Sequence, residues 1–369
     1  ISALEKLSTE EYDKLKPVQW PITEEVSSES KRVFADGIFP TKSGKANFYA
    51  VTPKQPQQQT SDAFPFILNT GRMRDQWHTM TRTSKACTLN QHSTKPYLQI
   101  NTEDADKLAL KNHQIVSVSS FVGNINVPIK ITSDVKPKQL FLPIHWNNQF
   151  SSNAVVSTLF HGLSDPISGQ PELKHLGVNL KDIEFKQYID IYHFEDLNIE
   201  SDYWHKTHLK HCFNLQCANV GNEAFSPDIL QSALPVQGEW FSLSSSEHLQ
   251  SQLICVNSGK LKCVAFFSDK PTEEPLNWIA ELFAKSSLSM EDMKALINLE
   301  YDEATANDKV ICSCFSVKKT KIIDAINSGC QSVAELGNKL KCGTNCGSCK
   351  PELSSIINEV NCNLFEEVS

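Results

Sequence analysis

The feature that most constrains this chain of 369 residues is a group of cysteines near its end. Six of its twelve cysteines lie between positions 312 and 349, and four of these form two close pairs, Cys312 with Cys314 and Cys346 with Cys349. The first residues do not have the basic-then-apolar pattern of an export signal. Clustered cysteines without such a signal indicate metal or redox chemistry rather than disulfides.

Four thiolates in two close pairs are the ligands that a [2Fe–2S] cluster or a structural zinc ion requires. Zinc pairs usually have two residues between the cysteines, so the single residue between Cys312 and Cys314 favours the iron–sulfur cluster. A four-cysteine zinc site and free thiols remain alternatives. Cys342, four residues before Cys346, is interpreted as a spare thiol.

Helix signals surround these cysteines. An apolar helix face over residues 322–326 can end at Gly329. Ser332 and Glu335 have the spacing of a capping box, and Pro351 suits the first turn of a further helix. We therefore expect each cysteine pair in a loop beside helix ends, where backbone N–H groups favour negative charge.

Residues 310–362 resemble the bacterioferritin-associated ferredoxin type of [2Fe–2S] domain. That small helical module also occurs fused within nitrite and nitrate reductases. The resemblance implies a cluster held by Cys312, Cys314, Cys346 and Cys349, and it leaves Cys342 without a role.

Earlier in the chain, alternation of apolar and polar residues predicts β-structure. Ile125, Val127, Ile129 and Ile131 alternate as in a half-buried strand. Short apolar runs over 64–70, 115–120 and 139–144 predict further strands. Asn101 predicts the start of a helix that continues through Leu108. Several short strands separated by polar turns indicate a small β-barrel with a few helices.

The same region has an unusual charge balance. Residues 62–182 contain 12 Lys and Arg against 9 Asp and Glu, whereas the whole chain has a net charge of −8. They also contain six of the eleven histidines. The overall charge argues against a general nucleic-acid binder, and the local balance suits an anionic ligand, with chance fluctuation as the alternative.

The apolar run that ends at Gly71 leads into a segment with phosphate-binding groups. A glycine after a strand lets backbone N–H groups approach a phosphate, and Arg72 and Arg74 can bond to its oxygens. Solvated surface arginines are the simpler interpretation. The glycine signatures of Rossmann and P-loop sites are absent, which disfavours both folds.

Residues 68–79 and 141–174 together resemble the molybdopterin-dinucleotide-binding domain of bacterial molybdenum oxidoreductases. The resemblance implies a double-psi β-barrel over residues 61–184 that binds a bis-molybdopterin guanine dinucleotide carrying molybdenum. Asp165 is implied as a contact of the guanine, with a simple turn at Asp165 and Pro166 as the alternative. The implied contact residues are Thr70, Gly71, Arg72, Met73, Arg74, Trp77, His78, Thr79, His145, Trp146, Asn153, Asp165 and Lys174.

Taken together, the two resemblances point to the large subunit of bacterial assimilatory nitrate reductases. This implies reduction of nitrate to nitrite, with electrons from an NAD(P)H-dependent flavoprotein subunit, a ferredoxin or a flavodoxin. It also implies a cytoplasmic protein that binds neither nucleic acid nor membrane. We expect this chain to be the C-terminal portion of a longer protein. The catalytic residues and a [4Fe–4S] cluster would lie upstream of Ile1, so no catalytic residue is expected here. Another molybdopterin oxidoreductase, such as a formate dehydrogenase, and a non-catalytic zinc protein are the alternatives.

The expected architecture is multidomain, mainly β with α. Residues 1–60 would be the tail of a preceding molybdopterin catalytic domain and a linker, 61–184 the barrel, 185–305 an α+β middle region of unknown role, and 306–369 the helical [2Fe–2S] domain. In the middle region, a helix is expected over 278–284 and a strand over 264–267. His205, His208 and His211 have the spacing of one helix face, which gives a weak metal-site hypothesis beside the simpler one of a solvated helix.

Overall fold

The computed structural model describes residues 4–18, 20, 22, 32–221, 226–244, 251–271, 273, 275–299 and 308–366. Its chain divides into two compact units, Ile1–Gln55 and Pro56–Ser369. The first contains helix α1 (Thr9–Asp13), which begins at a capping box formed by Ser8 and Glu11. All features that bear on function lie in the second unit.

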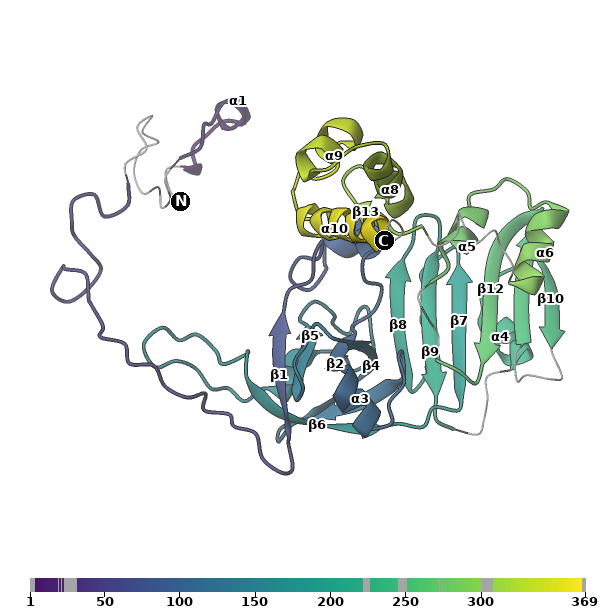
Figure 1. The fold of residues 1–369 in the computed structure, drawn as a ribbon, viewed down its shortest axis with the longest axis horizontal. Coiled ribbons are helices and arrows are strands. Elements are labelled where there is room, and N and C mark those ends of the chain that lie inside the picture. Colours follow the sequence, from purple (N-terminus) through teal and green to yellow (C-terminus); the bar gives the residue numbers. More distant parts are fainter. Residues whose placement is uncertain are drawn as a thin grey trace. The chain divides into compact units, whose positions relative to one another are not determined.

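A closed six-stranded barrel forms the first part of the second unit (Figure 1). Its strands are β1 (Phe66–Gly71), β2 (Leu98–Asn101), β3 (Ile115–Ser119), β4 (Asn124–Thr132), β5 (Gln139–Pro143) and β6 (Leu176–Asp182). They follow one another around the barrel in the order β1-β5-β2-β4-β3-β6. β1 is parallel to β5 and β2 is parallel to β4, whereas the other neighbours are antiparallel. The β-barrel expected from the sequence is therefore present.

Local sequence signals explain the barrel elements. Ile125, Val127 and Ile129 are fully buried in the barrel core, as their alternation predicts. Asn101 caps helix α3 (Thr102–Lys107) by accepting a hydrogen bond from the backbone N–H of Glu103, also as predicted. Short helical turns η2 (Thr83–Lys85), α2 (Cys87–Asn90) and η3 (Val156–Leu159) lie in the connections.

A six-stranded antiparallel sheet, not predicted from the sequence, follows the barrel. Its order is β10-β11-β12-β7-β9-β8. The strands are β7 (Gln187–His193), β8 (Tyr203–His208), β9 (Phe213–Asn219), β10 (Glu239–Ser244), β11 (Ser251–Asn257) and β12 (Lys260–Ser268). Helices α4 (Pro227–Ala233), α5 (Asn277–Leu282) and α6 (Met290–Asn298) accompany it. The expected strand at 264–267 lies in β12, and the expected helix at 278–284 corresponds to α5.

Helices cover both faces of this sheet. Leu230 of α4 packs in one apolar cluster with Ile189 and Ile191 of β7. Ile279 of α5 and Leu296 of α6 pack in a second cluster on the other face. The central strands are consequently buried on both sides, which leaves them without the alternation that identifies a strand in a sequence.

The helix expected around His205 and His208 is wrong, because both residues lie in strand β8. Side chains three positions apart on a strand point to opposite faces, so these two histidines cannot bind the same metal ion. Within the described ranges, no group of three or more His, Cys, Asp or Glu side chains could hold a metal ion.

The cysteine-rich end contains a short hairpin and three helices, drawn in yellow-green to yellow in Figure 1. The elements are β13 (Val310–Cys312), β14 (Val317–Lys318), α8 (Lys319–Asn327), α9 (Val333–Leu340) and α10 (Lys350–Glu366). Ser332 caps α9 as predicted, but the Glu335 carboxylate accepts from the N–H of Gln331, so the full capping box is not formed. No helix of the described residues is long and apolar enough to span a membrane.

Candidate cofactor sites

The loop that follows β1 is held in a strained conformation. Asp75, His78 and Met80 have φ angles of 68°, 45° and 61°, in the left-handed region that side chains other than glycine rarely adopt. Each such residue costs of order 1 kcal/mol, and such residues cluster at functional sites. This loop contains six of the thirteen residues that the family resemblance implies for dinucleotide binding.

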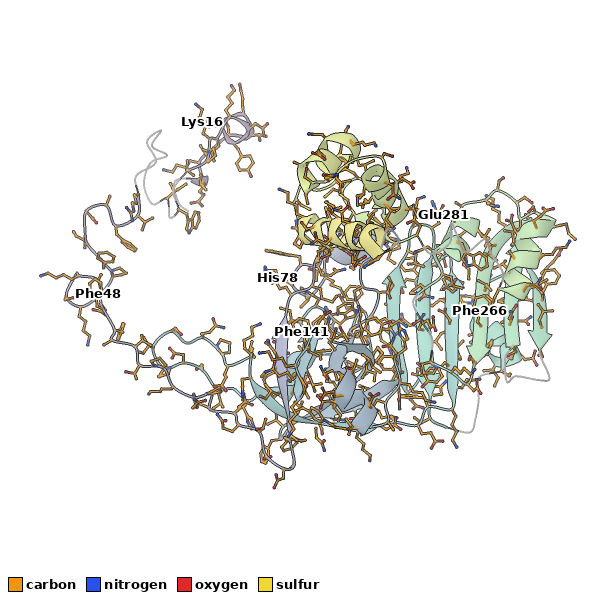
Figure 2. The ribbon with its side chains drawn as sticks, viewed as in Figure 1. Lys16, Phe48, His78, Phe141, Phe266 and Glu281 are labelled. Carbon is orange, nitrogen blue, oxygen red and sulfur yellow. The ribbon has the colours of Figure 1, made fainter. Side chains whose placement is uncertain are left out.

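Close packing fixes the point where the loop leaves the barrel. Gly71 lies against the ring of Phe141 on β5, and a Cβ at this position would come within 2.7 Å of Phe141 Cε2. Thr70 is buried, and its hydroxyl donates to the carbonyl of Leu173 over 2.7 Å. The Lys174 ammonium donates to the Thr70 carbonyl. Figure 2 labels Phe141 in the barrel and His78 in the loop.

His145 braces this loop from inside. It is fully buried, its Nε2 accepts from the backbone N–H of Met73 over 2.8 Å, and its Nδ1 lies 2.7 Å from the carbonyl of His78. The geometry requires a neutral ring with the proton on Nδ1. Burial lowers the pKa of His145, and the charge of Arg72 lowers it further, although the bond to the His78 carbonyl opposes them.

Four implied residues of the loop remain exposed to solvent: Arg72, Trp77, His78 and Thr79. The Arg72 guanidinium lies 4.9 Å from the ring centre of Trp77, which packs edge-on against His78 at 4.5 Å. Trp77 is 53% exposed. An exposed guanidinium beside exposed aromatic faces is suited to a phosphate and a planar base.

Other implied residues lie around the loop in different settings. Met73 packs against the barrel core. Trp146 is buried and, with Met80 and Trp204, lines a cavity of about 730 Å³ beside β8. Asn153 is exposed with a φ of 48°.

Asp165 closes a turn. Its carboxylate accepts hydrogen bonds from the N–H of Ile167, the N–H of Ser168 and the hydroxyl of Ser168. This arrangement is the Asx turn that the simpler alternative predicted.

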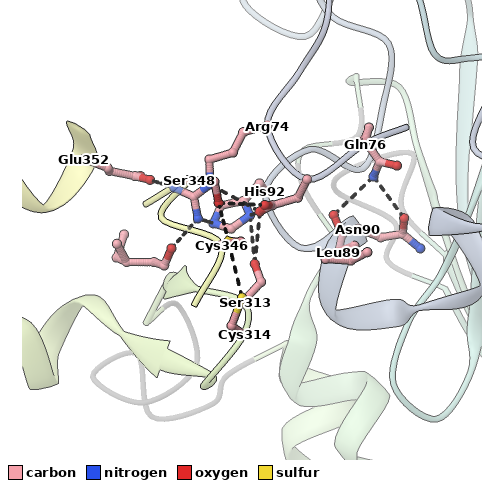
Figure 3. Close-up of polar contacts among 12 residues, drawn as sticks. Arg74, Gln76, Leu89, Asn90, His92, Ser313, Cys314, Cys346, Ser348 and Glu352 are labelled. Carbon is pink, nitrogen blue, oxygen red and sulfur yellow. Dashed lines mark hydrogen bonds and ion pairs between the residues drawn. The ribbon is translucent and has the colours of Figure 1, made fainter. Parts of the chain in front are cut away.

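Arg74 reaches the cysteine-rich end (Figure 3). Its guanidinium donates to the carboxylate of Glu352 on α10 and to the carbonyl of Ile311 on β13. It also contacts Nε2 of His92 at 2.6 Å. The side chain of Arg74 therefore joins the barrel loop to the cysteine-rich end.

Asp75 lies beside both cysteine loops. Its Oδ2 accepts a hydrogen bond from the hydroxyl of Ser313, and its Oδ1 accepts one from the hydroxyl of Ser348. Both distances are 3.1 Å. Nδ1 of His92 lies 2.5 Å from Oδ2. Burial alone would raise the pKa of Asp75, but the hydrogen bond from His92, the charge of Arg74 and the Ser313 hydroxyl lower it to about 2.

The two cysteine loops bring their thiols together in pairs. Sγ of Cys314 lies 3.4 Å from Sγ of Cys346, and both side chains are exposed. Cys312 and Cys349 are buried, and burial together with the neighbouring Cys312 raises the pKa of Cys349 to about 11. Hydrogen bonds with Ser348 lower the pKa of Cys346.

This donor set is compatible with a [2Fe–2S] cluster. Such a cluster takes four thiolates shared between two irons, so its ligands form pairs and do not converge on one ion. Cys342 is fully buried, its thiol donates to the Leu336 carbonyl, and burial raises its pKa. Its setting is that of a protonated core thiol, in line with its interpretation as a spare cysteine.

Neither Asp75 nor His92 was predicted from the sequence as a contact of the cysteine loops. The available signal was the serine beside each cysteine pair, Ser313 and Ser348, since each hydroxyl needs an acceptor. Nothing in the sequence indicates that the acceptor lies more than 200 residues away.

Comparison with known families matches both regions. Residues 66–177 match the family described as "Molydopterin dinucleotide binding domain". Residues 310–359 match the "BFD-like [2Fe-2S] binding domain". The chain therefore contains a molybdopterin-dinucleotide-binding domain and a BFD-like [2Fe–2S]-binding domain, and its cofactors are a molybdopterin dinucleotide and a [2Fe–2S] cluster.

Curated relatives extend this similarity to almost the whole chain. A nitrate reductase of Klebsiella oxytoca is 33% identical over 97% of this chain and 40% of that protein. A nitrate reductase of Shewanella frigidimarina is 25% identical over 96% of this chain and 41% of that protein. The alpha subunit of an F420-dependent formate dehydrogenase of Methanocaldococcus jannaschii is 30% identical over 46% of this chain and 24% of that protein. The chain thus spans about 40% of the length of these two nitrate reductases.

Proposed function

We propose that this chain is part of a molybdenum-dependent nitrate reductase, in which it closes over the dinucleotide and carries the [2Fe–2S] cluster. The observation that carries this proposal is the 33% identity to a nitrate reductase over 97% of the chain, which includes both cofactor domains and the sheet between them. When bound, the molybdenum would catalyse the removal of an oxygen atom from nitrate, which gives nitrite. The residues of this chain hold and orient the cofactors.

Dinucleotide binding is assigned to the barrel loop and its surroundings. Arg72 bonds to phosphate oxygens, while Trp77, His78 and Thr79 line the exposed face beside it. Their exposure and the Arg72–Trp77 contact support this role. Asn153 and Lys174 complete the exposed set.

A second set of implied residues acts by holding the loop. Thr70, Gly71, Met73 and His145 are packed or hydrogen-bonded beneath it. Trp146 lines the neighbouring cavity of about 730 Å³, which is within the range of known ligand sites. Arg74 and Asp165 also belong to the implied contacts, although their side chains are engaged by Glu352 and by the turn at Ser168.

The cluster is assigned to Cys312, Cys314, Cys346 and Cys349. The pairing of Cys314 with Cys346 and of Cys312 with Cys349 supports four-thiolate coordination. The exposed Cys314 and Cys346 form the edge that an electron-donor protein can approach. A NAD(P)H-dependent flavoprotein subunit, a ferredoxin or a flavodoxin would fill this role.

The finer features of the proposal follow the family. The barrel is of the double-psi type and the dinucleotide is the bis-molybdopterin guanine form. The parallel pairing of β1 with β5 and of β2 with β4 supports the barrel type. The domains are 1–60, 61–184, 185–305 and 306–369, the last a helical [2Fe–2S] domain. The enzyme is assimilatory and cytoplasmic, and a [4Fe–4S] cluster and the catalytic residues lie outside residues 1–369.

The cluster is tested by anaerobic reconstitution of the chain with iron and sulfide. We expect two irons and two sulfides per chain and an EPR signal after one-electron reduction. Stoichiometric zinc in place of iron would contradict the cluster assignment.

The reaction is tested with reduced viologen as electron donor. A longer protein that contains these residues and the molybdenum-ligand segment should produce nitrite from nitrate. The chain alone, supplied with molybdenum cofactor, should not exceed the cofactor blank. Nitrite formation by the chain alone would show that the catalytic residues lie within it.

The similarity to a formate dehydrogenase subunit supports a second candidate, oxidation of formate. That similarity covers 46% of the chain, against 97% for the nitrate reductase, so it is the weaker one. Formate oxidation without nitrate reduction by the longer protein would establish the second candidate.

A further inference from the structure

The barrel loop and the cysteine loops meet at one carboxylate. Ser313 lies between Cys312 and Cys314, and Ser348 precedes Cys349, so each cysteine loop contributes one hydroxyl. Both hydroxyls lie 3.1 Å from Asp75, one from each of its oxygens. A single side chain of the barrel therefore bonds to both loops that carry the cluster ligands.

Asp75 is itself held firmly. Its Oδ2 lies 2.5 Å from Nδ1 of His92 and 3.2 Å from Nε of Arg74. His92 in turn receives the Arg74 guanidinium at Nε2, which leaves Nδ1 as the donor to Asp75. Arg74 then extends to Glu352 and to the Ile311 carbonyl on the cysteine side. The side chains of Asp75 and His92 are 7% and 8% exposed, so the pair is largely withdrawn from solvent.

A buried carboxylate so close to the ligands also acts through its charge. Added negative charge beside a cluster disfavours the further electron that reduction brings. The two hydroxyls that reach the Asp75 carboxylate belong to residues directly next to cluster ligands, Ser313 beside Cys312 and Cys314, and Ser348 beside Cys349. The potential of the cluster should therefore respond to the charge at position 75.

We propose that Asp75 is a positioning residue that fixes both cysteine loops on the barrel loop and keeps the reduction potential of the cluster low. This inference rests on the proposed [2Fe–2S] assignment and adds to it. The proposal also accounts for the strained backbone at Asp75, where φ is 68°. This backbone conformation directs the carboxylate toward the two serines. The role of Asp75 toward the cysteine loops differs from that of its neighbours Arg72 and Trp77, whose side chains are exposed to solvent.

The test is a redox titration of the full 369-residue chain after cluster reconstitution, followed by EPR. Asp75→Asn removes the charge with little change of shape, and Asp134→Asn, at an exposed position after β4, is the matched control. We expect Asp75→Asn to raise the midpoint potential by about 60 mV, which is a tenfold change in a one-electron equilibrium. Asp134→Asn should leave the potential unaltered. Equal potentials in the two variants would overturn the electrostatic part of the proposal.

The docking part is tested by Ser313→Ala and Ser348→Ala, which keep the carboxylate and each remove its hydrogen bond to one cysteine loop. Ser313→Ala also removes a contact with His92 Nδ1, and Ser348→Ala one with Cys346 Sγ. Hydrogen exchange of the backbone over residues 72–80 and 308–318 should become faster in both variants, while the potential shifts less than in Asp75→Asn. Unchanged exchange in both serine variants would overturn the docking role. If Asp75→Asn does not retain the cluster, Asp75→Glu replaces it. If Asp75→Glu retains the cluster, the carboxylate role is supported. If Asp75→Glu loses the cluster and the backbone hydrogen exchange of Ser313→Ala and Ser348→Ala equals that of the wild type, the carboxylate role is refuted.

The outcomes separate this inference from the proposed function. A wild-type chain that binds zinc and no iron refutes the cluster assignment itself. A wild-type chain that binds the cluster, with a potential insensitive to position 75, refutes only the inference.

Discussion

The Nδ1 atom of His145 lies 2.7 Å from the carbonyl oxygen of His78, so a fully buried histidine holds the backbone of an exposed one. His145 comes from the segment after β5, and its other nitrogen holds Met73 at the opposite side of the same loop. The buried side chain of His145 thus fixes the backbone that positions the exposed residues of the loop.

His145→Phe should therefore loosen the loop without exposing the barrel core. Two hydrogen bonds to the backbone are lost, and each contributes about 0.5–1.5 kcal/mol net. We expect urea unfolding to show a loss of about 1–3 kcal/mol and hydrogen exchange over residues 72–80 to become faster. A variant with wild-type exchange in this loop would contradict the bracing role.

Gly71→Ala should destabilise the barrel because the added Cβ meets the ring of Phe141 at 2.7 Å. Overpacking of this kind costs about 1–3 kcal/mol, measured by urea unfolding. Phe141→Leu should relieve the clash, so the double variant should lose less stability than the two single variants added together. Gly162→Ala is the control, since a Cβ there has nothing within 4 Å.

Arg72→Ala should weaken retention of the dinucleotide in the longer protein. Loss of a charged hydrogen bond costs about 1.5–3 kcal/mol, which corresponds to roughly ten- to a hundredfold in affinity. Molybdenum content per purified protein is the measurement. Arg82→Ala, at another exposed arginine just after the loop, should retain the wild-type content. Equal molybdenum in both variants would remove Arg72 from the site.

Cys314→Ser should abolish or severely destabilise the cluster, because serine replaces a soft thiolate by a hard oxygen ligand. Cys342→Ser should keep it, since the Cys342 thiol points to the Leu336 carbonyl. Iron and sulfide content after reconstitution distinguishes the two. Loss of the cluster in Cys342→Ser together with its retention in Cys346→Ser would overturn the ligand assignment.

Stability should decrease in mild acid, and the buried His205 on β8 should contribute to this decrease along with the buried His145 and His193. Burial, and next the charge of Lys95, lower the pKa of His205 well below its ordinary value. The unfolded chain binds this proton near pH 6.5 and the folded chain does not, so stability is complete above about pH 6.5 and falls below it. The slope is up to about 1.4 kcal/mol per pH unit for one such group.

Urea unfolding between about pH 7.5 and pH 5.5 measures this slope. His205→Phe removes the titrating group and should make the decrease shallower. His211→Gln, at an exposed histidine, is the comparison and should preserve the wild-type slope. An identical slope in His205→Phe would show that another group controls the acid sensitivity.

Local patterns made the barrel and the cysteine-rich helices predictable. The alternation over Ile125–Ile129 survives because one face of β4 is buried, and Asn101 and Ser332 form caps with neighbours only two or three residues away. The sheet was not predictable in the same way. Strand β7 is buried along nearly its whole length, so its pattern does not alternate.

Polar residues inside the sheet obscured it further. Asp190, Asn214 and Gln216 are buried in β7 and β9, where the two amides donate to the Asp190 carboxylate. A sequence records the polarity of such residues but not the partner that makes their burial acceptable. The same limit hid Asp75, whose partners Ser313 and Ser348 lie at the other end of the chain.

The order of the barrel strands has a consequence for how this chain is made. Ile67 of β1 pairs with Gln139 of β5 and with Gly177 of β6, so β1 has no neighbour until those residues have left the ribosome. At about 5–20 residues per second, that wait is roughly 5–20 s. During it, Phe66 and Leu68, which the finished barrel buries, stay exposed. The first strand of the barrel to be synthesised is thus among the last to be enclosed, and its apolar side chains are open to aggregation over this interval.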